Sequence, residues 1–121
     1  MALLLGLTTY SASASPVDQV EAERIAKSFM QKGRNNVASF RLLKTNAAKA
    51  RKVAGTNVQP YYVFNSTTPD GGFVIVSGDD RFASVLGYSD SGTFSLDDAP
   101  DNVRQWMQQY AQYVEAYWAN P

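Results

Sequence analysis

Two short apolar segments in the middle of the chain, 60–65 and 72–77, constrain the fold most. Both are rich in the β-branched and aromatic residues that favour strands, and a Pro69-Asp70-Gly71 turn signal lies between them. The pair therefore predicts an antiparallel hairpin. Successive strand residues point to opposite faces, and both segments are apolar at successive positions. Either helices cover both faces of this hairpin, or part of its surface meets a partner.

Weaker strand signals flank the hairpin on both sides. The segment 82–88 follows the polar turn 78–81 and predicts a third antiparallel strand, and the mixed apolar run 38–43 predicts a fourth. Residues 44–59 are small, basic and interrupted by Gly55, so we expect a loop or a weak helix there. The pattern as a whole predicts a small antiparallel sheet of three to four strands.

A helical pattern stands at each end of the strand block. The first helix is expected over Pro16–Lys32, with Ser15 as its N-cap and Gly33 as its stop. The second begins within 98–102, where Asp and Pro suit a helix start. Its apolar positions recur at three- and four-residue spacing and predict a buried face that includes Trp106. These positions are Val103, Trp106, Met107, Tyr110, Tyr113, Val114, Tyr117 and Trp118. Helices at both ends of an antiparallel sheet make an α+β domain.

The length of 121 residues allows one core, so residues 15–121 are expected to form a single domain. Residues 1–14 contain an apolar run and an Ala-Ser-Ala motif, and they read as the remnant of a signal peptide; an added leader sequence is the alternative. The run is too short to cross a bilayer, so no stable membrane insertion is expected. The signal-peptide pattern predicts export to a secreted, periplasmic or cell-surface location, and the absence of Cys favours a bacterial over a eukaryotic secreted protein.

The residue types present in the chain exclude most catalytic mechanisms. There is no Cys and no His, so neither a Cys/His or Ser/His/Asp nucleophilic relay nor a zinc site of the usual ligands is available. The adjacent acids Asp79-Asp80 and Asp97-Asp98 fall in expected turns, where Asp is favoured for local hydrogen bonding. No Gly-rich phosphate loop is present. We expect neither an enzyme nor a bound cofactor or metal.

Charge is balanced overall but unevenly distributed. The net charge is zero, which gives no reason to expect a nucleic-acid partner. Nine basic residues and no acidic one lie between Arg24 and Lys52, whereas eight acidic and two basic residues follow from Val53 onward. A solvated basic surface explains the first run, and steering of an oppositely charged partner is the alternative.

Three segments together resemble the pro-segments of streptopain-like cysteine peptidases, including the interpain type. They are Tyr61-Tyr62-Val63-Phe64-Asn65, Gly71-Gly72-Phe73-Val74-Ile75-Val76-Ser77-Gly78-Asp79-Asp80-Arg81 and Leu86-Gly87-Tyr88-Ser89-Asp90-Ser91-Gly92-Thr93-Phe94. The resemblance implies a sheet-and-helix domain that caps the peptidase cleft and keeps the zymogen inactive. It also implies that the catalytic Cys and His belong to a domain after Pro121. The chain departs from the family at Ala83, where Pro is frequent, and this concerns local strand geometry only.

The same resemblance implies a site at the start of the last helix. The family's pro-segment places an Asn there into the active-site region, and the matching residue is Asn102. Ala99, Pro100, Asp101 and Val103 flank it and would form the loop that reaches the cleft. The residues by themselves indicate a simpler role for Asn102, since Asn is a good helix cap.

The leading hypothesis is a domain that inhibits a streptopain-like cysteine peptidase, in cis as a pro-domain or in trans as a separate inhibitor. A surface adhesion or assembly module that uses the apolar hairpin is the other class. That second class predicts self-association or glycan binding.

Overall fold

The computed structural model describes residues 16–31, 39–44, 51–53 and 55–119. Four strands form an antiparallel sheet in the order β1-β4-β5-β6, and two more form a separate hairpin, β2-β3. The elements in chain order are α2 (Gln19–Gln31), β1 (Phe40–Leu42), β2 (Arg51–Val53), β3 (Thr56–Val58), β4 (Tyr61–Ser66), β5 (Phe73–Ser77), β6 (Val85–Ser89) and α3 (Asp101–Ala119). The expected α+β class and the four-stranded antiparallel sheet are confirmed.

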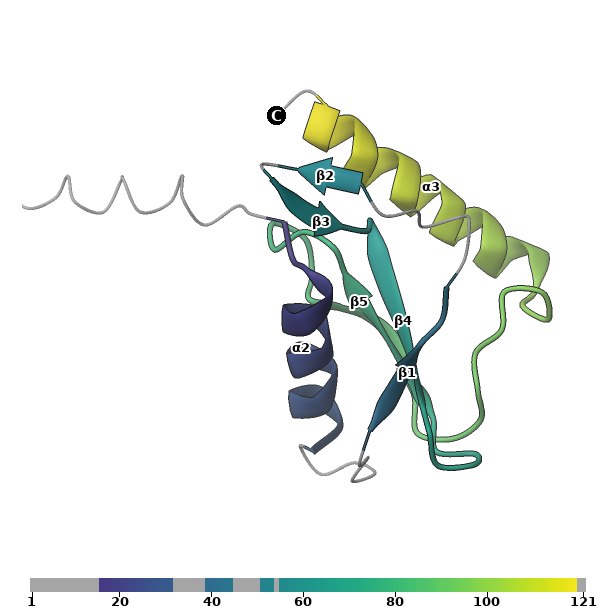
Figure 1. Ribbon diagram of the computed structural model, residues 1–121. Coiled ribbons are helices and arrows are strands. Elements are labelled where there is room, and N and C mark those ends of the chain that lie inside the picture. The colour runs from purple at the N-terminus through teal and green to yellow at the C-terminus, as the bar shows by residue number, and fades with distance from the viewer. Residues whose placement is uncertain (1–15, 32–38, 45–50, 54, 120–121) are drawn as a thin grey trace, which may run out of the picture.

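Helices α2 and α3 lie on opposite faces of the sheet (Figure 1). On one face, Tyr62 and Phe64 of β4 pack with residues of β5 against Ala26 and Met30 of α2. This layer buries residues at every second position of each strand, as the strand pleat requires. The remaining strand positions are free to serve the other face.

The opposite face is covered by α3. Tyr61, Val63 and Ile75 pack there against Met107 and Ala111. All six residues of β4 are consequently buried. Of the two explanations that the sequence left open for the apolar hairpin, cover by helices on both faces is the one found.

The start of α2 differs from the sequence expectation. The helix begins at Gln19, and its N-cap is Asp18, whose Oδ1 accepts a hydrogen bond from the Glu21 backbone N–H at 2.9 Å. Pro16 pairs with Asp79 in an isolated antiparallel bridge and is not the first helical residue. The proposed N-cap Ser15 lies outside the described residues. Docking of this segment on the sheet, three residues ahead of the helix, overrides its local helix signal.

The segment 44–59 is neither a loop nor a helix over its described C-terminal part. β2 and β3 pair antiparallel there, and Gly55 adopts a positive φ of 84° between them. Val58 is buried with Val114 and Trp118 of α3, so the hairpin covers the C-terminal part of that helix. Residues 45–50 and 54 lie outside the described part. These strands have three residues each and expose most of their side chains, so the sequence has no alternation of apolar and polar residues that would predict them.

A tyrosine hydroxyl ties the N-terminal segment to the sheet. Tyr62 Oη donates to the carbonyl oxygen of Val17 at 2.7 Å and accepts from the Gln59 backbone N–H at 3.1 Å. Burial raises the pKa of Tyr62 to about 12, because the phenolate is poorly solvated there. The folded state therefore favours the neutral phenol more strongly than the unfolded chain does.

We expect Tyr62→Phe to lower the free energy of unfolding at neutral pH by about 1–2 kcal/mol, since one buried and one partly buried hydrogen bond are lost. The Tyr62 pKa is raised on folding, so its contribution is complete below about pH 10 and is lost as the pH rises toward 12. The variant should thus lose less stability than the parent between these pH values. Burial also raises the pKa of Tyr61 and of Tyr110, so these two contribute to the loss that remains.

Urea titrations at neutral and alkaline pH measure both effects. Tyr113→Phe is the matched control, because Tyr113 is 63% exposed and its hydroxyl is not part of this buried contact. An unchanged alkaline loss in Tyr62→Phe would contradict the assignment.

Candidate functional site

The only buried carboxylate among the described residues, Asp79, is fully used by the chain itself. Trp118 Nε1 donates to Asp79 Oδ2 at 2.7 Å, and the Arg81 backbone N–H donates to Oδ1 at 3.0 Å. Arg81 Nε lies 3.0 Å from the same Oδ1, an ion pair without hydrogen-bond alignment. The Arg81 guanidinium also lies 3.7 Å from the centre of the Tyr117 ring. Asp79 therefore joins the sheet to the end of α3 and offers no free oxygen for chemistry.

The loop expected to carry function, 99–103, leads into α3. The Pro100 carbonyl accepts hydrogen bonds from the backbone N–H groups of Val103 at 3.0 Å and Arg104 at 3.1 Å. Pro100 is thus the N-cap, and Asn102 is the second residue of the helix. The simple capping role considered for Asn102 does not apply at that position.

The Asn102 side chain is exposed, and no hydrogen-bond partner for it exists within the described part of the chain. Its neighbour Asp101 pairs with Arg104 one turn along the helix, and both of these side chains are largely exposed. Pro100 is exposed as well, while Ala99 and Val103 are half-buried. The structure thus presents a free carboxamide at the first turn of α3, with two anchoring side chains beside it.

The segment that precedes this loop is tied to the hairpin β4-β5. The Asn65 side chain makes two hydrogen bonds to the backbone of Phe94: its Nδ2 donates to the carbonyl at 3.1 Å, and its Oδ1 accepts from the N–H at 2.7 Å. The Phe94 ring packs on Phe73 with ring centres 5.2 Å apart. Two residues earlier, Gly92 N–H donates to Asp70 Oδ1 at 2.8 Å. These contacts fix the path of the chain toward Asn102.

Sequence reasoning missed the role of Asn65. The residue is buried, and its partner Phe94 lies 29 positions further on. An Asn at the end of an apolar strand carries no signal of such a contact. The Asn65 carboxamide bonds to the Phe94 backbone as a peptide group of a neighbouring strand would, with one accepted and one donated hydrogen bond.

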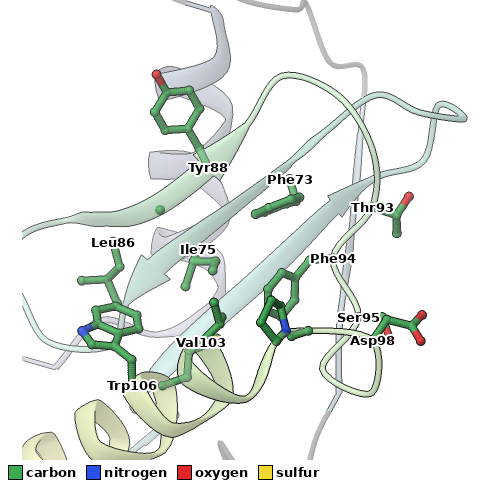
Figure 2. A pocket seen from close by; sticks show the side chains of 14 residues that line it. Phe73, Ile75, Leu86, Tyr88, Thr93, Phe94, Ser95, Asp98, Val103 and Trp106 are labelled. Atoms are coloured by element: carbon green, nitrogen blue, oxygen red, sulfur yellow. The ribbon is translucent and has the colours of Figure 1, made fainter.

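An open groove of about 460 Å³ lies beside the loop (Figure 2). Side chains of β5, β6, the 93–100 segment and the first turns of α3 line it. They include Phe73, Ile75, Leu86, Phe94, Asp98, Ala99, Pro100, Val103, Trp106 and Met107. The half-buried members of the predicted site, Ala99 and Val103, thus form part of an apolar wall, while Asn102 stands outside the groove.

The exposure of Trp106 departs from the sequence expectation. Trp106 is 46% exposed, and Tyr113 on the same helix is 63% exposed. The buried residues of α3 are Met107, Ala111, Val114 and Trp118. Helix α3 packs on only one face of the sheet. The stripe of side chains that it buries is therefore narrower than the stripe of apolar residues along the helix. The prediction of a core role for Trp106 is wrong.

Neither a membrane span nor a metal centre is found in the described residues. No helix there is both long and apolar enough to cross a bilayer. Likewise, within residues 16–31, 39–44, 51–53 and 55–119, no three acidic side chains gather where they could hold a metal ion. These findings concern the described ranges alone.

The fold and the site define a small α+β domain whose buried polar residues serve its own packing and whose pinned loop carries an exposed Asn. The chain belongs to the Spi protease inhibitor family, whose model matches residues 14–114. An inhibitor domain of this family is a non-catalytic region, in agreement with the sequence analysis.

Two curated bacterial proteins are similar to this chain. The thiol protease/hemagglutinin PrtT of Porphyromonas gingivalis is 36% identical over 111 residues, which is 88% of this chain and 12% of that protein. Streptopain of Streptococcus pyogenes is 35% identical over 104 residues, or 81% of this chain and 24% of that protein. The chain therefore spans less than a quarter of the relatives' length. The resemblance to streptopain-like pro-segments is confirmed.

Proposed function

We propose that this chain is the inhibitory pro-domain of a secreted bacterial cysteine peptidase of the streptopain type, and that it acts by covering the active-site cleft. Membership of a protease-inhibitor family supports the inhibitory role. Similarity to small parts of two thiol proteases supports the role of a pro-domain. A separate inhibitor acting in trans would use the same surface. The observation that carries the site is the exposed Asn102 in the first turn of α3, to which a segment held by Asn65 leads.

Helical geometry explains how this loop can block a peptidase without being cleaved. A cysteine peptidase attacks a carbonyl carbon that its nucleophile can approach, whereas Asn102 lies in the first turn of an α-helix. The Asn102 side chain has one acceptor and two donor positions available for the catalytic groups of the enzyme. Because Asn65 already fixes the preceding loop, little conformational entropy is lost on docking.

The competing idea of an adhesion module is not favoured by the sheet. It relied on an exposed apolar face of the central hairpin. Strand β4 is buried along its whole length, and β5 is buried except at Phe73, which is half-buried. Open apolar surface remains in the groove beside the Asn102 loop.

Asn102→Ala tests directly whether the Asn102 side chain enters the active-site cleft of the peptidase, a role called the plug below. The purified chain should inhibit mature streptopain, and the variant should inhibit it about tenfold more weakly, the expected cost of one hydrogen bond to a charged group. Ala is a better helix former than Asn, so the variant should remain at least as stable. The measurement is an inhibition constant from initial rates of peptide hydrolysis.

Asn57→Ala serves as the matched control. Asn57 is an exposed Asn on β3, in the small hairpin that covers the C-terminal part of α3. This variant should inhibit as well as the parent. Equal potency of the two variants would remove Asn102 from the interface, and an inactive parent chain would overturn the inhibitory role itself.

A further inference from the structure

The groove beside the Asn102 loop differs in chemistry between its two ends. Leu86, Ile75 and Trp106 make an apolar end, while Ser95 and Asp98 lie at the other end (Figure 2). Asp98 is the one acidic residue among those that line the groove. The occupant that matches both ends has an apolar stem and a positive charge.

The chain supplies no such charge from its own described residues. Neither Asp97 nor Asp98 has an ion-pair partner within the described ranges, and both are exposed. From residue 82 to residue 119 there are five acidic residues and a single basic one, Arg104, which is paired with Asp101. This segment therefore carries a net negative charge, which complements a basic surface.

We propose that the groove receives a Lys or Arg side chain from the surface of the inhibited peptidase. This inference rests on the proposed function and adds a second contact beside the Asn102 plug. The aliphatic stem lies along the apolar floor next to Trp106, and the cationic group reaches Asp98. Trp106 is half exposed, and at the apolar end of the groove its ring gives the stem a surface to pack against.

The chain already uses this combination internally. The Arg81 guanidinium lies between a carboxylate, Asp79, and the face of an aromatic ring, Tyr117, at 3.0 Å and 3.7 Å respectively. In the groove, Trp106 and Asp98 lie at opposite ends, so the ring contacts the stem and the carboxylate contacts the cation, which the partner must bring. A contact of this kind contains an aromatic anchor, as the energetically dominant centres of protein interfaces commonly do.

Inhibition of mature streptopain by the full chain and its variants tests the proposal. Asp98→Asn should weaken inhibition about tenfold at low ionic strength and should flatten its dependence on salt. Trp106→Ala should weaken inhibition by about tenfold at any ionic strength. Asp97→Asn removes the same charge one residue away, outside the groove, and should change the inhibition constant less than about threefold. Thermal melts establish that each variant is folded.

The outcomes separate this inference from the proposed function. If Asp98→Asn and Asp97→Asn weaken inhibition equally, the acidic segment acts only by long-range attraction and the groove contact is overturned. Parental potency of folded Trp106→Ala also overturns it. In either case a weakened Asn102→Ala variant leaves the plug in place. Failure of the parent chain to inhibit streptopain overturns both.

Discussion

Asp79→Ala should lower the free energy of unfolding by about 3–5 kcal/mol, the usual cost of removing one partner of a buried ion pair. Asp79 is fully buried, and its loss leaves Arg81 without its carboxylate and Trp118 Nε1 without its acceptor. Urea denaturation followed by tryptophan fluorescence measures the change, because Trp118 contacts the substituted side chain directly.

Asp80→Ala is the matched control for this prediction. Asp80 follows directly in the chain and is exposed, so its substitution should cost less than about 1 kcal/mol. In a double-mutant cycle, Arg81→Ala should cost much less in the absence of Asp79 than in its presence, since the two charges interact directly. A loss below about 1 kcal/mol in Asp79→Ala would show that Asp79 does not hold α3 to the sheet.

Local sequence signals predicted the parts of the fold that depend on neighbouring residues. The strands β4 and β5 are rich in β-branched and aromatic residues, and their two apolar faces indicated either helices on both sides or a surface for a partner. The turn role expected for Asp79 is also present, since its Oδ1 accepts from the Arg81 N–H. Its bond to Trp118, 39 positions away, has no local signal. Packing across the whole domain decides contacts of that kind.

The failures of sequence reasoning have the same origin. Pro16 favours a helix start locally, but a bridge to Asp79 holds it extended. The strands β2 and β3 expose most of their side chains, and their buried residue, Val58, packs against Val114 and Trp118 of α3. Trp106 fits a helical stripe that α3 does not bury in full. In each case a tertiary contact decided the outcome.

The candidate site was only partly within reach of the sequence. The resemblance pointed to 99–103, and the structure places this loop at the start of α3 beside an apolar groove. The sequence could not show what holds the loop in place, because Asn65 and Phe94 belong to separate segments of the chain. The exposure of Asn102 likewise depends on how α3 lies on the sheet. The inhibitory role of the loop stays a prediction.

Asn65→Ala should weaken inhibition of mature streptopain more than Asn102→Ala does, by about thirtyfold. Without Asn65, the backbone of Phe94 loses both of its side-chain partners, and the loop toward Asn102 gains freedom. Ordering a backbone residue costs about 1–2 kcal/mol, so the release of even two residues gives a penalty of this size on docking. The inhibition constant measures the effect.

Two comparison variants locate the cause in the loop. Asn65→Asp keeps the acceptor for the Phe94 N–H but turns a second acceptor toward the Phe94 carbonyl, so its inhibition should also fall. Thr67→Val removes the contact of 2.6 Å between the Thr67 and Ser39 hydroxyls, which joins the turn of the same hairpin to the start of β1 and not to Phe94, and should leave inhibition unchanged. If Asn65→Ala is folded and inhibits like the parent, the fixed loop is unnecessary. The affinity would then have to come from the groove and the exposed turn of α3 alone.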